Sequence, residues 1–407
     1  MRGIRLQFFL VYAVLGSVSP LMPVLLVESK GFREAQVGLA WSFWSVAMLV
    51  APVVFTLLAD LRVDSRRIMG VALAVAAGAL AGMERAESVP ATLIWWLLFS
   101  LAHAPILSLL DGLYFAWRRH EEEGSRSVPA YQRVRVFGTA GFVVPSLLLY
   151  LLLSPRTSSA LPAWLPHGFS LDIILWLGSG CCLGAALHTL VLPGLAQTRL
   201  PVRRGIPSLD AARRLMQPDT RWLCAALIFA FFAFVAYSAF FPVYLRQYAG
   251  VSAGVTGLII NLGVVLEVLY ILGMARIRNR LGIRRFLLCG LGAMAIRYFL
   301  LATFPGAGMA LAVQVVHGLE ITALYVLPVL YLNELAGDHF RNSIQGVFAM
   351  LLGASRITGS LLAGWIAEHH LLWVFYHASA MGAIGWLIVY LGFGRKPGWR
   401  REARQVA

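Results

Sequence analysis

Charged residues are scarce in this chain. Only 13% of its 407 residues are Asp, Glu, Lys or Arg, whereas 59% are hydrophobic, and the mean hydropathy is +0.75. Soluble domains carry roughly 25% charged residues, so the composition excludes that class and indicates a polytopic membrane protein. The four cysteines all lie inside apolar runs and offer neither a disulfide framework nor metal-ligand spacing.

Motifs of enzymes and ATP-driven pumps are also missing. No glycine-rich phosphate loop followed by Lys and Ser or Thr occurs, which leaves ATP drive unsupported. His103, His188 and His317 lie in separate apolar runs, without the spacing of a metal site or of a nucleophile and its base. The longest polar stretch, Gly194 to Arg221, is too short for the output domain of a sensor. We therefore expect no catalytic residue, no metal and no cofactor.

Long apolar runs dominate what is present. Each is long enough, or nearly so, to cross a bilayer as a helix, and only helices or closed barrels satisfy their backbone groups there. The first run exceeds the roughly 7–15 residues of a signal-peptide core and is expected to remain as a helix. The predicted spans are about 6–27, 36–59, 68–84, 90–116, 132–153, 169–193, 222–245, 253–275, 286–304, 308–333, 344–366 and 372–393.

Positive charge is distributed unevenly between the loops. If the N-terminus is cytoplasmic, the inner segments hold 27 of the 34 Lys and Arg residues and the outer loops hold five. The positive-inside rule thus predicts that both termini are cytoplasmic in a cell inner membrane. The net charge of +15 is then a consequence of topology, and we expect no nucleic-acid partner.

The polar stretch at 194–220 divides the spans into six and six. We therefore predict an N-terminal bundle at 1–193, a cytoplasmic linker at 194–220, a C-terminal bundle at 221–394 and a basic cytoplasmic tail at 395–407. This arrangement is similar to that of major facilitator transporters, whose two halves are related by an axis along the membrane normal. The resemblance implies an all-α membrane fold of twelve helices in two pseudo-symmetric bundles.

The loop "LADLRVDSRR" resembles the inner-face signature of that superfamily through Asp60, Arg66 and Arg67. In the family, an acid and basic residues at helix ends latch helices together on the inner face. This copy departs from the pattern, because Thr56 stands where glycine is expected and Asp64 is inserted before Ser65.

Three further stretches resemble the group that contains lactose permease, phenylpropionate permeases and nucleoside/proton symporters. "AYQRVRVFGTAGFVV" resembles the Arg-x-Arg/Trp/Phe-Gly-x-x-Gly segment that opens their fifth helix, and "HAPILSLLDGLYF" resembles the end of their fourth. "VVHGLE" resembles the tenth helix of lactose permease, where a His precedes a Glu by three residues.

Two acids, one arginine and one histidine lie inside the eighth, ninth and tenth predicted spans. His317 and Glu320 are three residues apart and share one helix face, while Arg297 and Glu267 lie well inside neighbouring spans. An ionised residue at mid-membrane costs about 2.5–3.5 kcal/mol on a translocon scale. Arg297 can neutralise only one of the two carboxylates, and burial favours the protonated form of the other.

A carboxyl group that gains and loses a proton inside a dry cavity is what a proton carrier requires. The resemblance implies that Glu320 carries the proton, that Arg297 facilitates its deprotonation, and that His317 and Glu267 link proton binding to substrate binding. The alternative is that these residues are static contacts between helices, which contribute about 0.6 kcal/mol on average.

Asp111 and Arg135 are the substrate-binding candidates of the first half. They resemble the acid and the arginine that hold substrate hydroxyls in lactose permease, although Arg135 could equally be an ordinary inner-face charge. Arg356 lies inside the eleventh span without a counterpart in lactose permease. It could bind an anionic substrate, pair with an acid, or lie toward a polar cavity mouth.

Prolines are expected to interrupt four paired helices of the two halves. Pro20, Pro105, Pro242 and Pro328 fall in the first, fourth, seventh and tenth spans, and such breaks point to cavity and hinge positions. Trp41, Trp44, Tyr114, Tyr237 and Tyr270 could stack on a sugar or a base.

Taken together, the sequence predicts a transporter that imports a small polar metabolite in symport with protons by alternating access. Nucleosides, sugars and aromatic acids all remain open as substrates. The alternative within transport is a proton-coupled antiporter that exports drugs or metabolites. The expected partners are the substrate, protons and the lipid bilayer, and we expect the chain to function as a monomer.

Overall fold

The computed structural model describes residues 2–60, 64–123, 131–154, 168–192, 213, 215–218 and 220–394. Side chains at 2, 51–60, 116, 119, 122–123, 132, 275 and 333–346 fall outside the description. The described part is helical almost throughout, and ten of its helices are long and apolar enough to cross a membrane, besides the shorter Ile173–Thr189. The predicted linker, apart from a few residues at its end, and the predicted basic tail lie outside the described residues.

The chain divides into two compact units. Unit 1 comprises Met1–Arg203 and Pro242–Asn261, and unit 2 comprises Arg204–Phe241 and Leu262–Ala407. The C-terminal end of the seventh span and the start of the eighth therefore pack with unit 1, although the sequence places them in the second half. Within this stretch Arg246 Nε donates to Glu28 Oε1 at 2.8 Å.

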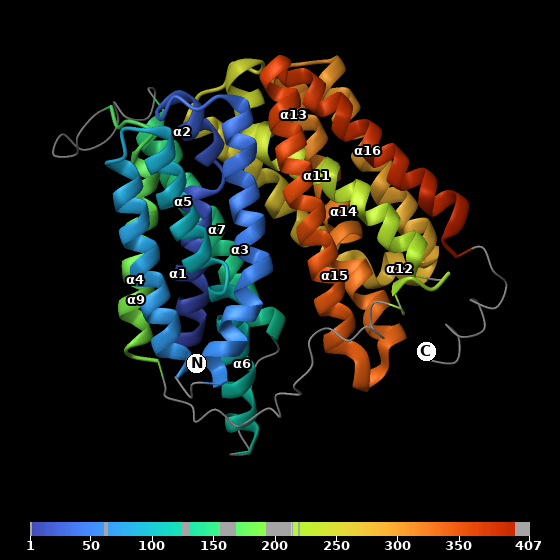
Figure 1. Ribbon diagram of the computed structural model, residues 1–407, viewed down its shortest axis with the longest axis horizontal. Coiled ribbons are helices and arrows are strands. Elements are labelled where there is room, and N and C mark those ends of the chain that lie inside the picture. The colour runs from blue at the N-terminus through green and yellow to red at the C-terminus, as the bar shows by residue number, and fades with distance from the viewer. Residues whose placement is uncertain are drawn as a thin grey trace. The chain divides into compact units, whose positions relative to one another are not determined.

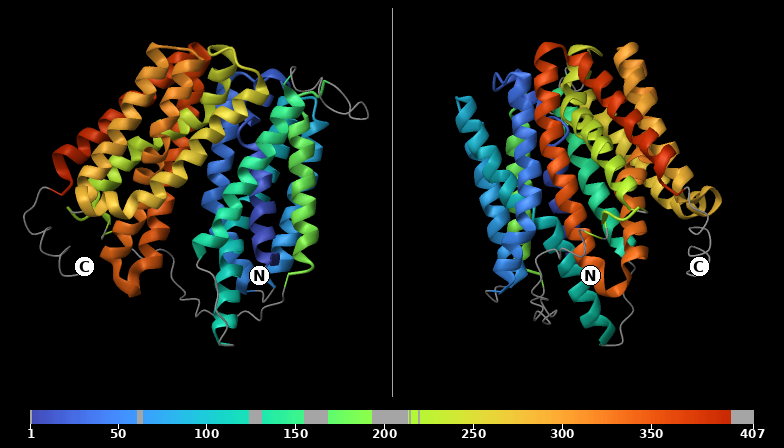
Figure 2. Two further views of the ribbon diagram at one scale, coloured as in Figure 1. Left: turned by 180° about the vertical axis from the view of Figure 1, so that it is seen from behind. Right: turned by 45° about the vertical axis from the view of Figure 1, so that its right-hand side comes forward.

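Unit 1 is built around its first helix. Figures 1 and 2 show α1 lying between α7 and α9, and α1 packs against both. The helices of unit 1 are α1 (Arg2–Val18), α2 (Met22–Glu28), α3 (Glu34–Asp60), α4 (Ser65–Glu84), α5 (Val89–His103), α6 (Ile106–Glu123), α7 (Tyr131–Leu153) and α9 (Ile173–Thr189).

Unit 2 contains most of α11 (Arg221–Gln247) and of α12 (Ala253–Thr303), followed by α13 (Ala307–Ala312), α14 (His317–Ile321), α15 (Leu327–His369) and α16 (Leu371–Gly392). α12 contains both the eighth and the ninth predicted spans. The chain turns between them at Gly282, where φ is +75°. An L side chain rarely adopts that backbone conformation, so glycine is the residue that allows the turn.

Three of the four predicted proline interruptions are confirmed. Pro20 lies in the break between α1 and α2, Pro105 lies between α5 and α6, and Pro328 occupies the first turn of α15. The prediction for Pro242 is wrong, because α11 runs through it without a break. A membrane helix tolerates an internal proline when neighbouring groups satisfy the freed carbonyl.

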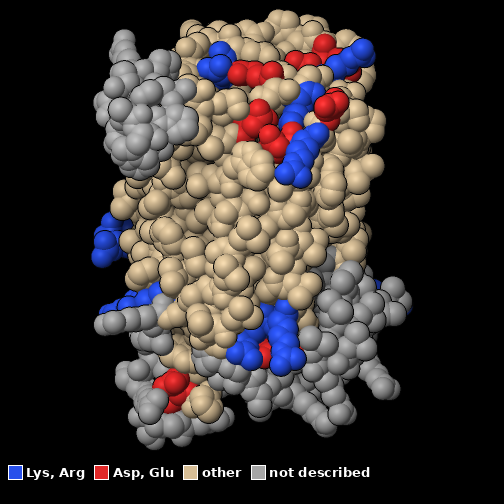
Figure 3. All heavy atoms as spheres, turned by 90° about the vertical axis from the view of Figure 1, so that its left-hand side faces the viewer, with Lys and Arg blue, Asp and Glu red and all other residues tan. Residues whose placement is uncertain are grey.

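Charge is arranged as a bilayer requires. On the face shown in Figure 3, Lys, Arg, Asp and Glu gather toward the two ends, and the band between them is nearly free of charge. Such a band matches the hydrocarbon layer, where an unpaired charge is costly.

Candidate functional site

The tenth span is broken where the sequence places its two titratable residues. Between α13 and α15 the chain forms a 3-10 turn, η1 (Val313–Val316), the short helix α14 and a π-helical turn, η2 (Thr322–Val326). Turns of these two kinds within a helix often mark functional positions. His317 and Glu320 both belong to α14, between the two irregular turns.

Arg297 and Glu320 form an ion pair inside unit 2. Arg297 Nη1 lies 2.7 Å from Glu320 Oε2, and the two residues are 1% and 0% exposed. The same Nη1 lies 2.8 Å from His317 Nδ1. Because a guanidinium has only donors, His317 Nδ1 accepts, and the neutral ring carries its proton on Nε2. The structure thus brings together three of the four predicted proton-coupling residues.

Two tyrosines and a glutamine complete the surroundings of this pair. Arg297 Nη2 donates to the Tyr237 hydroxyl and, at 3.2 Å, to Gln314 Oε1. The Tyr298 hydroxyl donates to Glu320 Oε1. The rings of Tyr237 and Tyr298 stack with centroids 5.0 Å apart, and the Arg297 guanidinium lies 4.1 Å from the Tyr237 centroid. The Arg297 cluster is defined here as Tyr237, Arg297, Tyr298, Gln314, His317 and Glu320.

Glu267 lies beside this cluster rather than within it. A Cβ on Gly318 would come within 2.6 Å of Glu267 Cα, so α12 and α14 touch there through backbone atoms. None of the described hydrogen bonds of Arg297 goes to Glu267, and Glu267 is partly exposed, whereas Glu320 is buried. Of the two carboxylates, Arg297 therefore pairs with Glu320.

Arg356 is positioned by α15, near the middle of the apolar stretch Val347–His369. Its Nε is buried without a hydrogen-bond partner among the described residues, while the residue as a whole is partly exposed. Arg356, Glu267 and Glu320 all lie within electrostatic range of the Tyr325 hydroxyl on η2.

The substrate candidates of unit 1 also form a cluster. The Tyr131 hydroxyl donates to Asp111 Oδ1 at 2.7 Å, and the Arg135 guanidinium lies 4.1 Å from the centroid of the Tyr12 ring. Asp111 and Arg135 lie within electrostatic range of one another, and both are partly exposed. The Asp111 cluster is defined here as Tyr12, Asp111, Tyr131 and Arg135.

The glycines of the "RVFGTAG" segment explain how α7 meets α1. A Cβ on Gly141 would lie 2.1 Å from the Phe9 carbonyl oxygen, and one on Gly138 would lie 2.8 Å from the Tyr12 ring. A larger residue at either position would push the helices apart. The two glycines therefore allow the backbones of α1 and α7 to lie close together, and this contact places the Tyr12 ring against the Arg135 guanidinium.

The contacts of the predicted inner-face motif differ in part from those expected. Arg66 Nη2 lies 2.9 Å from Asp64 Oδ2, and its Nη1 donates to the Leu192 carbonyl at 2.5 Å, which ties the start of α4 to the segment after α9. Arg67 is exposed. The side chain of Asp60 lies outside the described residues. Asp64, which the sequence presents as an insertion, thus acts as the acid partner and also caps α4.

Sequence reasoning missed several polar partners. Tyr298, Gln314 and Tyr131 carried no signal beyond being polar side chains near predicted titratable residues. Tyr237 was predicted only as a possible stacking ring, whereas it accepts a hydrogen bond from Arg297. A buried charge needs several partners, and polar residues in the neighbouring spans were the available signal.

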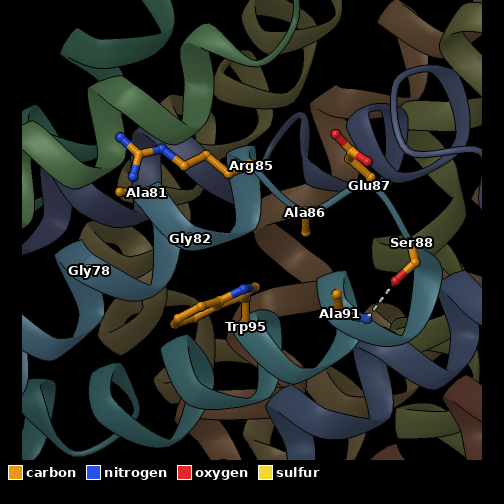
Figure 4. A pocket seen from close by; sticks show the side chains of 9 residues that line it. All are labelled: Gly78, Ala81, Gly82, Arg85, Ala86, Glu87, Ser88, Ala91 and Trp95. Carbon is orange, nitrogen blue, oxygen red and sulfur yellow. Dashed lines mark hydrogen bonds between the residues drawn. The ribbon is translucent and has the colours of Figure 1, made fainter.

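One groove lies away from all of these residues. It is lined at the turn between α4 and α5 by Gly78, Gly82, Arg85, Glu87 and Trp95, among others, and none of the predicted site residues lines it. In Figure 4 the Arg85 and Glu87 side chains point away from each other and do not converge on a shared position.

The chain is similar to known transporters over most of its length. It is 24% identical over 369 residues to the putative nucleoside transporter YegT of Escherichia coli K12, covering 84% of this chain and 79% of that protein. It is 22% identical to the xanthosine permease of the same organism, covering 96% and 91%. The crystal structure of the nucleoside transporter NupG superposes with a TM-score of 0.81 at 18% identity, covering 97% of this chain and 99% of that one.

The family model described as "MFS_1 like family" matches residues 2–378. That match covers the two predicted bundles almost completely and confirms the fold expected from the sequence, a multi-pass all-α membrane protein. The chain belongs to the MFS_1 like family.

Proposed function

We propose that this protein is a secondary transporter that imports a nucleoside in symport with protons. The observation that carries the proposal is the buried Arg297–Glu320 ion pair on a tenth span that is broken on both sides of α14. A purely structural ion pair needs no such break. An ion pair that must open and close as the protein changes conformation benefits from a break in the helix that carries it.

Glu320 is the proposed proton carrier. As a carboxylate it accepts from Arg297 and Tyr298, and protonation removes the charge that holds Arg297 in place. Arg297 keeps its charge throughout, and after protonation of Glu320 it would be held by its neutral partners, Tyr237 and Gln314. Neutral His317 lies beside Arg297 Nη1. It would pass the change at the ion pair on to the side of α14 that contacts Glu267.

Both units contain polar residues that are candidates for substrate binding. In unit 1, Asp111 and Arg135 supply an acceptor and a donor fork, which suits neighbouring ribose hydroxyls. In unit 2, Glu267 and Arg356 supply the same two functions. The names of the relatives support a nucleoside rather than a sugar or an aromatic acid. The same names favour uptake over the exporting antiporter.

The proposed setting is a cell inner membrane with both termini in the cytoplasm and the monomer as the working unit. The uneven distribution of Lys and Arg between the predicted loops supports this orientation. Arg66 and Asp64 would then lie on the inner face, where the Arg66 contact to Leu192 would stay closed while the bundles move.

The test is uptake by the full chain reconstituted into liposomes. With an inward proton gradient, radiolabelled nucleoside should accumulate above the outside concentration, and an uncoupler should abolish this. Glu320→Gln should lose accumulation but keep nucleoside exchange, because the glutamine mimics a permanently protonated acid. Glu368→Gln, which removes an exposed carboxylate near the end of α15, should behave as the unmodified chain.

Two results would contradict the proposal. Unchanged accumulation by Glu320→Gln would remove Glu320 from the coupling step, and loss of nucleoside driven by the inward proton gradient would indicate antiport. Binding of maltose or 3-phenylpropionate without binding of any nucleoside would replace the substrate class.

A further inference from the structure

A groove runs along unit 2 between the second half of α12 and the first half of the tenth span. Its walls come from residues within 288–300 and within 309–316, and both stretches belong to helices that are apolar and long enough to cross a membrane. Gly292 and Ala312 line it, so small residues leave the space between the two helices unfilled. Ile296 and Ala312 are exposed, which means that the groove opens toward the lipid around the protein.

The length and the lining of this groove suit an acyl chain. The stretch 288–300 rises by about 18 Å, at about 1.5 Å per residue of α-helix. The hydrocarbon core of a bilayer is about 30 Å thick, so one leaflet contributes about 15 Å. Every lining residue except Arg297 is apolar. A single hydrocarbon chain that lies along the helices therefore matches the groove, whereas a compact polar molecule does not.

An unpaired arginine lies on the same face of α12, just beyond the end of the groove. Arg285 precedes Leu288 by three residues and Cys289 by four, and both of these line the groove. Residues at these spacings share one face of a helix. Arg285 is exposed, and the described residues supply it with no hydrogen bond or ion pair. Its neighbour Arg284 differs, because its Nη2 donates to the Tyr390 carbonyl at 2.8 Å.

Positive charge is concentrated at this end of the groove. The stretch 276–285 contains five arginines and no acid, and Arg276, Arg280 and Arg285 are exposed. Clusters of basic residues at the end of a membrane span attract anionic lipid headgroups. A guanidinium also matches the oxygens of a phosphate with parallel N–H donors. The charge at the end of the groove thus complements a lipid whose headgroup carries a negative phosphate.

We propose that this groove binds one anionic glycerophospholipid, with an acyl chain between α12 and the tenth span and the phosphate at Arg285. The apolar lining selects the chain and the arginine selects the charge, so neither a free phosphate nor a zwitterionic lipid supplies both contacts fully. This inference is independent of the proposed function.

The bound chain would also cover one side of the Arg297 cluster. Arg297 lines the groove, and its Nε is buried without a hydrogen-bond partner among the described residues. Hydrocarbon in the groove keeps water away from this side of the guanidinium. The interaction of Arg297 with Glu320 is stronger where water is excluded, because the local dielectric constant is lower.

The test is lipid binding to the purified, delipidated full chain in a neutral detergent, measured by native mass spectrometry. Phosphatidylglycerol should bind with a stoichiometry of one and more tightly than phosphatidylcholine. Arg285→Gln should weaken the binding of phosphatidylglycerol about fivefold and change that of phosphatidylcholine much less. Glycerol 3-phosphate, which has the phosphate but no acyl chain, should not displace the bound lipid.

Two matched controls separate this groove from general lipid binding. Arg280→Gln removes an exposed arginine from the same turn, but on the other side of Gly282, and should leave the affinity nearly unchanged. Ala312→Phe fills the groove and should abolish the one-to-one binding of phosphatidylglycerol. Ala307→Phe changes an exposed alanine of the same helix α13 that does not line the groove, and it should keep the bound lipid.

Three results would overturn the inference. An equal loss of affinity in Arg285→Gln and Arg280→Gln would indicate a diffuse surface charge, and unchanged binding by Ala312→Phe would place the chain elsewhere. Displacement of the lipid by glycerol 3-phosphate would assign the site to a free phosphate. All four substitutions are at exposed positions, and thermal unfolding of each variant verifies that the fold is retained.

Discussion

The Arg297 cluster and the Asp111 cluster contain the same kinds of groups but differ in how they are enclosed. In unit 2 the acid and the arginine touch directly at 2.7 Å and are almost completely buried. In unit 1 the acid is held by a tyrosine, the arginine stacks on another tyrosine, and both are partly exposed. A closed pair suits a group that handles a proton, and an open pair leaves donors and acceptors free for a substrate.

The largest expected effect follows from removing the arginine of the closed pair. Arg297→Gln leaves the Glu320 carboxylate buried without its cation, and we expect a loss of about 3–5 kcal/mol in the free energy of unfolding. Arg135→Gln, at the open cluster, should cost less than about 1 kcal/mol. Denaturant unfolding of the purified variants measures both.

The double variant Arg297→Gln with Glu320→Gln provides the control, because it removes both charges and should recover much of the stability. Equal losses for Arg297→Gln and Arg135→Gln would show that enclosure does not distinguish the two clusters.

The next largest effect is expected from disturbing the close contact between α1 and α7. Gly141→Ala places a methyl group about 2.1 Å from the Phe9 carbonyl oxygen, and overpacking of this kind costs about 1–3 kcal/mol. Because α7 must then move away from α1, the stacking of Arg135 on Tyr12 should be lost and substrate affinity should fall. Thermal unfolding and binding measure the two effects.

Gly184→Ala on α9 is the matched control for Gly141→Ala, because a Cβ at Gly184 meets nothing within 4 Å. This control should be neutral or slightly stabilising. If the two alanine variants unfolded at the same temperature, the close contact of α1 with α7 would not limit stability.

The smallest expected effect is the difference between two hydroxyl deletions. Tyr298→Phe takes a donor from the buried Glu320 and should cost about 1.5–3 kcal/mol, as for other hydrogen bonds to charged groups. Tyr131→Phe takes one from Asp111, where water can replace it, and should cost under about 1 kcal/mol. A larger loss for Tyr131→Phe would reverse the comparison in unfolding measurements.

Several features of the fold could be predicted because they depend on local sequence. The apolar runs predicted the spans, since each must match the bilayer thickness by itself. The breaks at Pro20 and Pro105 followed from proline chemistry, but Pro242 did not break α11, because neighbouring groups decide whether a proline is tolerated. The three-residue spacing predicted that His317 and Glu320 share a face.

The sequence by itself determined that this is a membrane protein and which titratable groups lie inside its spans, because burial in lipid restricts composition residue by residue. Only the tertiary structure decided which groups pair. Arg297 takes Glu320 and not Glu267, and Asp64 holds Arg66. Helical periodicity fixes the face on which a side chain lies, whereas its partners depend on how helices distant in the sequence pack against that face.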